Sequence, residues 1–298
     1  MAFIEVRGIQ KSFATNGPMR HVLRDVSLDM EQGEFVSIVG AMGSGKSTLL
    51  SLLAGLTMPD GGTIAIGGEP VRGVHRHAAF VFQNYSLLPW FTALENVRLA
   101  VEAAFPALTR EQQVARARDA LGKVGLANAV NRRPRQLSGG MRQRVAIARA
   151  MATEPQVLFL DDPFGALDAL TRETLQQELA AVGSQADRPV TTVMITNSVE
   201  EAILLSDRIV PILPGPPLDH ARGALSSAER APATLGASIP VELPRPRTVA
   251  QLAHDEQATH VRSHVVATLT ASPGRLRKVA TEPGTASRVL QAVAKEMP

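Results

Sequence analysis

The hydrophobic positions of the chain form short apolar runs separated by longer stretches of mixed character. Three runs are apolar almost throughout: EFVSIVG at 34–40, QVLFLD at 156–161 and TTVMIT at 191–196. Such runs are typical of parallel strands that are covered on both faces. The runs FIEV at 3–6 and TIAI at 63–66 alternate more between apolar and polar residues. We therefore expect a mainly parallel sheet with an antiparallel flank.

A long helical stretch interrupts these strands, because residues 93–152 contain no convincing strand pattern. Apolar residues recur there at the three- and four-residue steps of amphipathic helices, at Val114, Leu121 and Val124 and again at Met141, Val145, Ala148 and Ala152. The sequence thus predicts an α/β core with an α-helical subdomain inserted at about residues 88–152.

The composition changes after about residue 213. The stretch LPGPPLDHARGALSSAERAPATLG is rich in Pro, Gly, Ala and Ser, which is typical of irregular structure. We expect one principal domain over residues 1–215, an irregular linker over 216–245 and a helical tail over 246–298.

Composition narrows the class of protein only slightly. The chain has 298 residues, of which 45% are hydrophobic and 20% charged, as in ordinary soluble proteins. A net charge of +3 gives no basic footprint, so we expect no nucleic-acid partner. The absence of cysteine excludes disulfides, thiolate chemistry and cysteine-bound zinc. No run approaches the ~18 apolar residues of a membrane span and the N-terminus lacks a signal-peptide pattern, so membrane work would need a partner.

A phosphate-binding loop follows the first buried strand. The sequence GAMGSGKST has the spacing G-x-x-x-x-G-K-[ST], with a strand before it and the helical run LLSLLAGL after it. Glycines let the backbone turn its N–H groups inward around phosphate oxygens, and the helix adds its positive N-terminal end. A glycine-rich turn that binds nothing is the alternative, and this flanking context favours the phosphate site. The predicted contacts are Gly40, Ala41, Met42, Gly43, Ser44, Gly45, Lys46, Ser47 and Thr48.

Two adjacent carboxylates end the second buried strand. In P-loop NTPases, an Asp at the end of a neighbouring strand holds Mg²⁺ together with the Ser or Thr of the loop. Asp161 fits that position, and we predict a Mg²⁺ site at Ser47 and Asp161. Neighbouring side chains of a strand point to opposite faces, so Asp162 needs a role of its own.

The segment LSGGMRQRVAIARA at 137–150 narrows the family. Taken alone, it fits a serine helix cap followed by a solvated arginine face. Together with GAMGSGKST, VFQNYSLLPW, FLDDPFGALD and VMIT, in this order and spacing, it closely resembles the signature of ATP-binding cassette ATPases. The resemblance extends from residue 3 to about residue 215, so residues 1–215 are expected to form an ABC ATPase domain with the P-loop NTPase fold.

The resemblance implies two ATP molecules held between two chains in a head-to-tail dimer. The backbone N–H groups of Ser138, Gly139 and Gly140 begin a helix and would meet the γ-phosphate bound by the other chain. Gln83 would sense the γ-phosphate and Mg²⁺, and Asp168 would organise the contact between the chains. Phe13 lies where the family stacks adenine on an aromatic ring, although a core phenylalanine explains it equally well.

The sequence departs from the family at two catalytic positions. Asp162 stands where most relatives have the glutamate that orients the attacking water, and Asn197 stands where most have a histidine. Asp is one methylene shorter than Glu, and Asn cannot carry a positive charge. With Gln83 and Lys46 as the other catalytic residues, we expect slow turnover and a partner ATPase with Glu and His. The alternative is that a small backbone shift brings Asp162 to the water.

Three further stretches resemble the nitrate/sulfonate/taurine branch of importer ATPases, and most closely its nitrate, nitrite, bicarbonate or cyanate type: VFQNYSLLPWFTALENV, LLSDRIVPILPGP and ATLGASIPVELPRPR. This implies transmembrane permease subunits, a second ATPase subunit, and indirectly a periplasmic or lipid-anchored solute-binding protein. The chain would then lie at the cytoplasmic face of the inner membrane. Tyr85 to Trp90 fall where the family docks its permease, or they belong to the subdomain core.

Two other functions fit parts of the sequence. In the first, the chain clamps ATP without turnover as a catalytically degenerate, regulatory subunit, because Asp162 and Asn197 depart from the family. A cassette ATPase of DNA repair or translation is the other candidate. Such proteins carry coiled-coil or zinc insertions or tandem cassettes, which this chain lacks.

Overall fold

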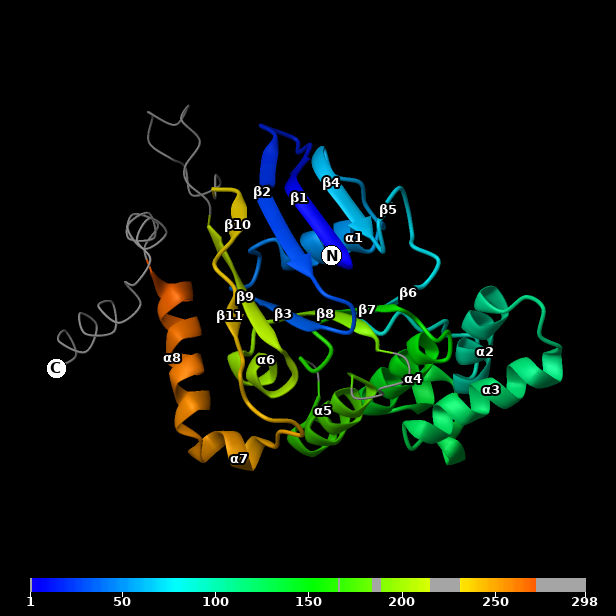
Figure 1. The fold of residues 1–298 in the computed structure, drawn as a ribbon. Helices are drawn as coiled ribbons and strands as arrows, with labels where there is room; N and C mark the ends of the chain where they lie inside the picture. The colour runs from blue at the N-terminus through cyan, green and yellow to red at the C-terminus, as the bar shows by residue number, and fades with distance from the viewer. Residues whose placement is uncertain (1, 166, 184–188, 215–230, 272–298) are drawn as a thin grey trace.

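The computed structural model describes residues 2–165, 167–183, 189–214 and 231–271. In this part of the chain the strands form one mixed sheet with the order β5-β4-β1-β2-β10-β9-β3-β8-β7-β6, and β11 pairs with β9. Figure 1 shows the sheet curling around helix α1, with helices α2 and α3 protruding at one end and α7 and α8 at the other.

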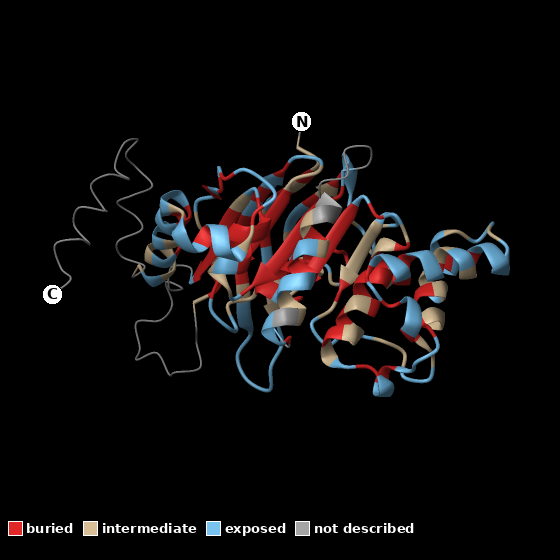
Figure 2. Cartoon of the chain, turned by 90° about the horizontal axis from the view of Figure 1, so that it is seen from below, coloured by how far each residue is buried: buried red, intermediate tan, exposed pale blue. Residues whose placement is uncertain are grey.

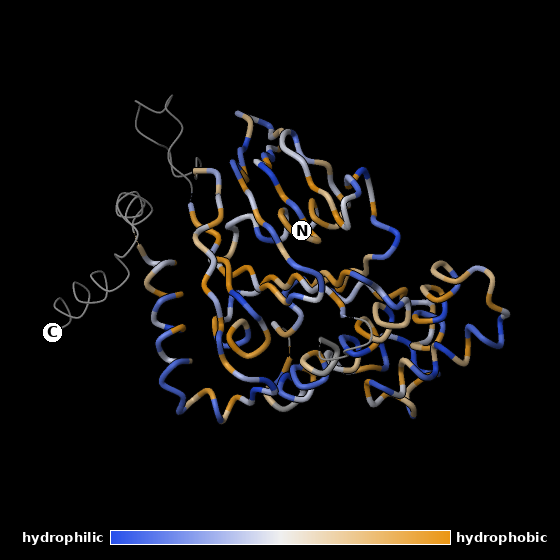
Figure 3. The backbone as a smooth tube through the Cα atoms, viewed as in Figure 1, coloured by the Kyte–Doolittle hydropathy of each residue, from blue (hydrophilic) through white to orange (hydrophobic). Residues whose placement is uncertain are grey.

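The parallel half of the sheet contains the three apolar runs. Strands β3 (Phe35–Val39), β8 (Thr191–Thr196) and β7 (Val157–Asp161) lie side by side and pair in parallel. Strand β6 (Ala78–Val81) extends the sheet beyond β7, and β9 (Arg208–Pro214) extends it beyond β3. Every residue of β3 and β8 is buried, and Figure 3 shows that the central strands consist mainly of hydrophobic residues. The predicted parallel core is confirmed.

The antiparallel flank is also confirmed. Strands β1 (Ile4–Phe13), β2 (Arg20–Met30), β4 (Gly61–Ile66) and β5 (Glu69–Pro70) pair antiparallel to one another. The buried side chains of α1 (Lys46–Leu53) share one core cluster with those of β1, β2 and β4 from the flank and of β3, β7 and β8 from the parallel half. The helix that follows the phosphate loop is therefore fixed between the two halves of the sheet.

The helical insertion contains α2 (Ala93–Ala104), α3 (Arg110–Lys123), short 3-10 turns at Ala127–Ala129 and Pro134–Gln136, and α4 (Gly139–Met151). Capping boxes begin α2 and α3, because the side chains of Thr92 and Thr109 accept from the backbone three residues later. Leu121 and Val124 of the predicted apolar face are buried, whereas the first turns of α3 differ from the prediction. Gln113 is buried, and Val114 only partly, because the Gln113 amide donates to Leu108 O at 3.1 Å and its Oε1 accepts from Arg98 at 3.2 Å.

Two helices follow strands of the parallel half: α5 (Ala169–Gly183) comes after β7, and α6 (Val199–Leu205) after β8. The described segment after residue 230 packs against this core. Strands β10 (Ala233–Leu235) and β11 (Ile239–Pro240), which lie in the range expected to be irregular, pair with β9. Helices α7 (Val249–His254) and α8 (Glu256–Thr270) lie in the expected helical tail, and residues 272–298 lie outside the described residues.

Arg247 ties this segment to α6. Its buried guanidinium donates to the carbonyl oxygens of Ile203 and Ser206, at 2.6 and 2.8 Å, and burial lowers its pKa to about 10. Figure 2 shows buried residues concentrated along the central strands and exposed residues on the outer helices. None of the described helices is long and apolar enough to cross a membrane.

Candidate nucleotide site

The phosphate loop connects β3 to α1. Gly45, at the start of α1, has a left-handed backbone with φ +95°, which disfavours any residue with a side chain. A Cβ atom at Gly40 would overlap the side chain of Ile212 and lie 2.9 Å from its backbone oxygen. The two glycines therefore allow the loop to fold tightly against β9 and present its backbone N–H groups at the end of the helix.

Lys46 is held inside this loop, with only 8% of the residue exposed. Its ammonium donates to Gly40 O at 2.8 Å, to Ala41 O at 2.9 Å and to Asn197 Oδ1 at 2.8 Å. Burial lowers the pKa of Lys46, while the charges of Asp162 and Asp161 oppose that shift. The lysine charge is thus positioned by contacts from two strand ends.

Asp161 and Asp162 have different partners, as their opposite faces predict. Ser47 Oγ donates to Asp161 Oδ1 at 3.2 Å, and Gln83 Nε2 donates to Asp162 Oδ2 at 3.3 Å. Asp162 has a left-handed backbone with φ +44°, and its N–H donates to Ile195 O at 2.9 Å. Burial is the main cause that raises the pKa of both carboxyls, and Lys46 opposes it in each case.

A cavity of about 460 Å³ brings most predicted site residues together. Its lining includes Phe13, Met42, Gly43, Gly45, Lys46, Ser47, Thr48, Gln83, Asp161, Asp162 and Asn197. It lies at the carboxyl ends of β3, β6, β7 and β8, where ligands bind in open parallel sheets. Phe13 is 41% exposed there, which favours a binding role over a core role. Gly40, Ala41 and Ser44 support the loop from outside this lining.

Sequence reasoning missed several residues of this region. Thr15, Arg20 and Val22 line the cavity from the β1–β2 hairpin, and only the strand pairing of Phe13 with Arg20 brings them there. Arg172, in the first turn of α5, opposes the raised pKa of Asp162 by its charge. Its position one helical turn after Asp168 is the signal that could have drawn attention to it.

The signature segment does not line this cavity. Ser138 caps α4, and its Oγ accepts from Met141 N at 3.2 Å. A Cβ atom at Gly140 would overlap Cγ2 of Thr171 in α5, so glycine is needed for the close approach of these two helices. Ser138, Gly139 and Gly140 therefore form a second helix N-terminus that is separate from the lysine-bearing cavity of the same chain.

The segment Tyr85 to Trp90 divides between the two roles expected for it. Leu87 and Tyr85 pack against the core, whereas Trp90 is 63% exposed. Tyr85 and Ser86 both have positive φ angles, and Arg149 of α4 donates to the carbonyl oxygens of both residues. The segment following Gln83 is therefore connected directly to the signature helix.

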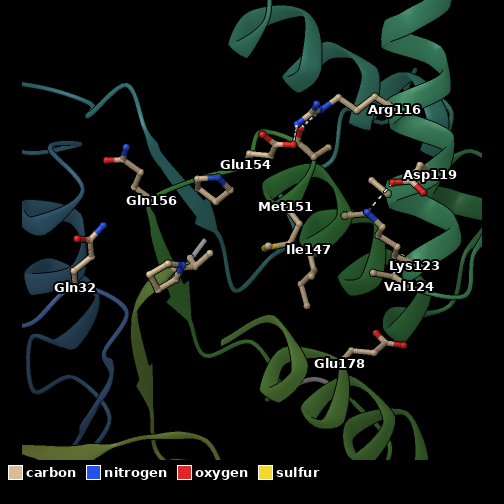
Figure 4. A pocket seen from close by; sticks show the side chains of 16 residues that line it. Gln32, Arg116, Asp119, Lys123, Val124, Ile147, Met151, Glu154, Gln156 and Glu178 are labelled. Carbon is tan, nitrogen blue, oxygen red and sulfur yellow. Dashed lines mark hydrogen bonds and ion pairs between the residues drawn. The ribbon is translucent and has the colours of Figure 1, made fainter. Parts of the chain in front are cut away.

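A larger cavity, of about 850 Å³, lies at the opposite ends of the parallel strands. Figure 4 shows two ion pairs among its charged side chains: Arg116 with Glu154 at 2.7 Å and Lys123 with Asp119 at 2.8 Å. It has no glycine loop. In neither cavity do the described His, Asp and Glu residues form a group of three or more that could hold a metal by themselves. The smaller cavity is thus the better candidate for chemistry.

Comparisons with known proteins agree with this choice. Residues 23–165 match the protein family described as ABC transporter. The nitrate transport protein NasD of Klebsiella oxytoca is 41% identical over 88% of this chain and 94% of NasD. The bicarbonate transport ATP-binding protein CmpC of Synechococcus elongatus is 42% identical over 89% of this chain. That match covers 37% of CmpC, so the chain spans little more than a third of that relative's length.

A solved structure shares the fold. It is a dimeric, post-hydrolysis state of the ATP-binding cassette MJ0796 bound to ADP and Pi, with a TM-score of 0.68 and 29% identity. The match covers 81% of this chain and 100% of the MJ0796 chain. With NasD matched over almost its whole length, this chain belongs to the ATP-binding cassette transporter family.

Proposed function

We propose that this chain binds and hydrolyses Mg-ATP as the ATP-binding subunit of an importer for a small anion such as nitrate or bicarbonate. The observation that carries the proposal is the cavity in which Lys46, Ser47, Gln83, Asp161 and Asp162 meet beside a phosphate loop. The nitrate and bicarbonate class rests on what the names of NasD and CmpC say of those proteins.

The residues present fit a magnesium-bound triphosphate. The loop has a buried ammonium for phosphate oxygens, and Asp161 is a half-buried carboxylate that accepts a hydrogen bond from Ser47 Oγ. Ser47, Asp161 and Gln83 would hold Mg²⁺, which when bound supplies positive charge to the β- and γ-phosphate oxygens. Phe13 offers an exposed ring at the cavity wall for the base.

Asp162 is the base in this proposal. Its Oδ2 accepts from Gln83, which fixes the carboxylate at the cavity, and burial raises its pKa, which strengthens it as a proton acceptor. Phosphoryl transfer depends mainly on positioning and on charge stabilisation, which Lys46 and the loop provide. The short Asp162 side chain supports slow turnover, with fuller activity beside a partner ATPase.

A second chain would complete the site. Ser138, Gly139 and Gly140 begin α4 outside the lysine-bearing cavity, so they are available to an anion held elsewhere. We propose that these residues close over the γ-phosphate bound by Lys46 of a second copy or a related ATPase subunit. The dimeric state of the MJ0796 structure supports this arrangement.

The exposed Trp90 supports a docking place for the permease. A large aromatic ring that is 63% exposed beside Phe91 and Leu88 is typical of a protein interface. Docking there would hold the chain at the cytoplasmic face of the inner membrane, and a solute-binding protein would act through the permease. Arg149 would couple this docking place to α4, because its guanidinium donates to the carbonyl oxygens of Tyr85 and Ser86.

The alternative, a regulatory subunit that clamps ATP without turnover, has one observation in its favour. Asn197 Oδ1 accepts a hydrogen bond from the Lys46 ammonium, which a cationic side chain could not do. This position therefore carries no positive charge that could act on the γ-phosphate during turnover. Release of phosphate distinguishes the two functions, because both require nucleotide binding but only the first releases inorganic phosphate.

The first test is Mg-ATP binding and phosphate release by the purified chain. Lys46→Ala should weaken Mg-ATP binding by at least about 100-fold, because several charge-assisted hydrogen bonds are lost. Lys123→Ala is the matched control, since Lys123 is exposed and paired with Asp119 away from the cavity, and should bind normally. Normal binding by Lys46→Ala would contradict the proposal.

A further inference from the structure

Lys46 has no hydrogen-bond donor left over. A lysine ammonium has three N–H groups, and the structure gives it three acceptors at 2.8 to 2.9 Å: Gly40 O, Ala41 O and Asn197 Oδ1. If a phosphate oxygen is to bind this ammonium, one of the three acceptors must give way. Nucleotide binding is therefore an exchange of partners at Lys46.

Asn197 is the acceptor that can leave most easily. Gly40 is packed against Ile212, and the oxygen of Ala41 also accepts from Ser44 N at 3.2 Å, so neither backbone carbonyl moves without the loop. Asn197 is exposed, and its oxygen is carried by a side chain that can change rotamer.

The backbone beneath Asn197 is fixed on both sides. Thr196 Oγ1 donates to the buried Glu201 at 2.6 Å and accepts from Ser198 N at 3.0 Å. Ser198 Oγ in turn accepts from Glu201 N at 3.3 Å and caps α6. At the other end of α6, Arg247 holds the last carbonyl oxygens. The side chain of Asn197 can therefore turn while its backbone remains in place.

We propose that Asn197 is a positioning residue for Lys46 that a nucleotide must displace, so that it lowers the affinity for ADP and favours nucleotides that have a γ-phosphate. This inference rests on the proposed function. The displaced amide has two N–H donors, which can contact a γ-phosphate but have no comparable group to meet in ADP. Displacing Asn197 therefore weakens the binding of ADP, whereas ATP regains part of the lost binding free energy through the contact of Asn197 with its γ-phosphate.

The chemistry of the asparagine is specific to this role. A protonated histidine has donors only and could not accept from Lys46. An asparagine accepts through its oxygen and donates through its nitrogen, so one side chain can serve the lysine first and the phosphate afterwards. The departure from the family at position 197 thus has a physical consequence for nucleotide binding, independent of turnover.

The test compares the binding of Mg-ADP and of a non-hydrolysable Mg-ATP analogue by calorimetry. Asn197→Ala should bind ADP about threefold to tenfold more tightly than the unmodified chain, because one hydrogen bond to a charged group no longer competes. The analogue should gain less, so the preference for the analogue over ADP should shrink by a similar factor. Asn128→Ala, an exposed asparagine of the helical insertion, should change neither value.

A second variant should change the affinity for ADP in the opposite direction. Asn197→Asp places a carboxylate beside Lys46, which should weaken ADP binding by at least about tenfold through charge repulsion of the phosphates. Thermal unfolding without nucleotide checks that both variants fold, and Asn197→Asp should unfold at the same or a higher temperature because its carboxylate pairs with the ammonium.

Unchanged or weaker ADP binding by Asn197→Ala would overturn the inference, as would normal ADP binding by Asn197→Asp. Failure of the proposed function has a different pattern. In that case the unmodified chain would bind neither nucleotide, and Lys46→Ala would be indistinguishable from it.

Discussion

The helices α1 and α4 both begin at glycine-containing loops, but the two beginnings are built differently. Helix α1 starts at Gly45 with a left-handed backbone and no side-chain cap, and Lys46 anchors its loop through internal hydrogen bonds. Helix α4 starts at Ser138 with an extended backbone, and the serine side chain caps the helix itself. Neither helix has an acidic residue in its first turn, whereas α2 and α3 each have a glutamate there.

The difference indicates a division of labour. Neither helix has a carboxylate in its own first turn to neutralise its positive N-terminus, which suits an anion at each. Only the first is joined to a cavity with acids that fit a metal, and only the second lies outside it. In the proposed function, a chain built in this way would hold its own nucleotide at α1 and offer α4 to the nucleotide of another chain.

The largest effect is expected at the start of α1. Gly40→Ala would place a methyl group over Ile212, so the loop must shift. Nucleotide binding should fall by at least about 100-fold, and the free energy of unfolding should fall by about 1–3 kcal/mol from overpacking. Calorimetry with Mg-ADP and denaturant unfolding measure the two effects. Gly73→Ala is the control, because a Cβ atom there meets nothing within 4 Å.

A change at the start of α4 should separate binding from association. Gly140→Ala would collide with Cγ2 of Thr171 and push α4 away from α5. The single chain should still bind nucleotide within about twofold, but nucleotide-dependent association should weaken by about tenfold or more. Sedimentation with a non-hydrolysable ATP analogue measures this. Adding Thr171→Ser removes the colliding methyl group and should restore association, and a loss of nucleotide binding would count against the division.

A substitution at Asp162, directly after β7, should change the rate of ATP turnover. Asp162→Glu extends the carboxylate by one methylene towards the position of the family's base, and should raise phosphate release by about threefold to tenfold. Binding of ADP should not change, because Asp162 contacts Gln83 and not the phosphate loop. An unaltered rate would show that the shorter side chain already reaches the water.

The smallest effect concerns how α4 is held against α5. Glu178 of α5 has one buried carboxylate oxygen without a hydrogen-bond partner among the described residues, and its nearest cation is Arg144 of α4 at 4.0 Å. Burial raises the pKa of Glu178, and Arg144 opposes the shift. The folded chain therefore holds this proton more tightly than the unfolded chain, and stability is lost as pH rises through the raised pKa.

Glu178→Gln removes this pH dependence. The variant should gain stability relative to the unmodified chain between about pH 4.5 and about pH 7, by less than about 1 kcal/mol. Denaturant unfolding at both pH values measures the difference. Asp119→Asn is a suitable control, because Asp119 is exposed and paired with Lys123. A difference that shrinks towards neutral pH would contradict the assignment.

Much of the fold was predictable because its signals are local. Continuous apolar runs predicted the parallel strands, and three- and four-residue steps predicted the helical insertion. The short strands β10 and β11 were not predicted, because three and two residues carry no periodicity. They form because β9 and β2 offer unpaired edges to them.

The site was predictable where one motif carries it, as around Lys46. Its links between distant segments were not. Asn197 lies 151 positions from Lys46, and Arg149 lies 64 positions from Tyr85, and no local pattern announces either contact. Both contacts depend on how the strands and helices are arranged around them, which only the folded chain shows.

The most direct test of the central claim, that one chain's α4 closes the site at another chain's α1, is a mixing experiment. Lys46→Ala chains and Ser138→Glu chains are labelled with different fluorophores and mixed with a non-hydrolysable Mg-ATP analogue. Each variant alone lacks a complete site, but the mixed pair has one, made of Lys46 from one chain and Ser138 from the other. The account predicts nucleotide-dependent energy transfer in the mixture and no association of either variant alone. A mixture that associates no more than the separate variants, while Ser138→Glu still binds nucleotide, would contradict it.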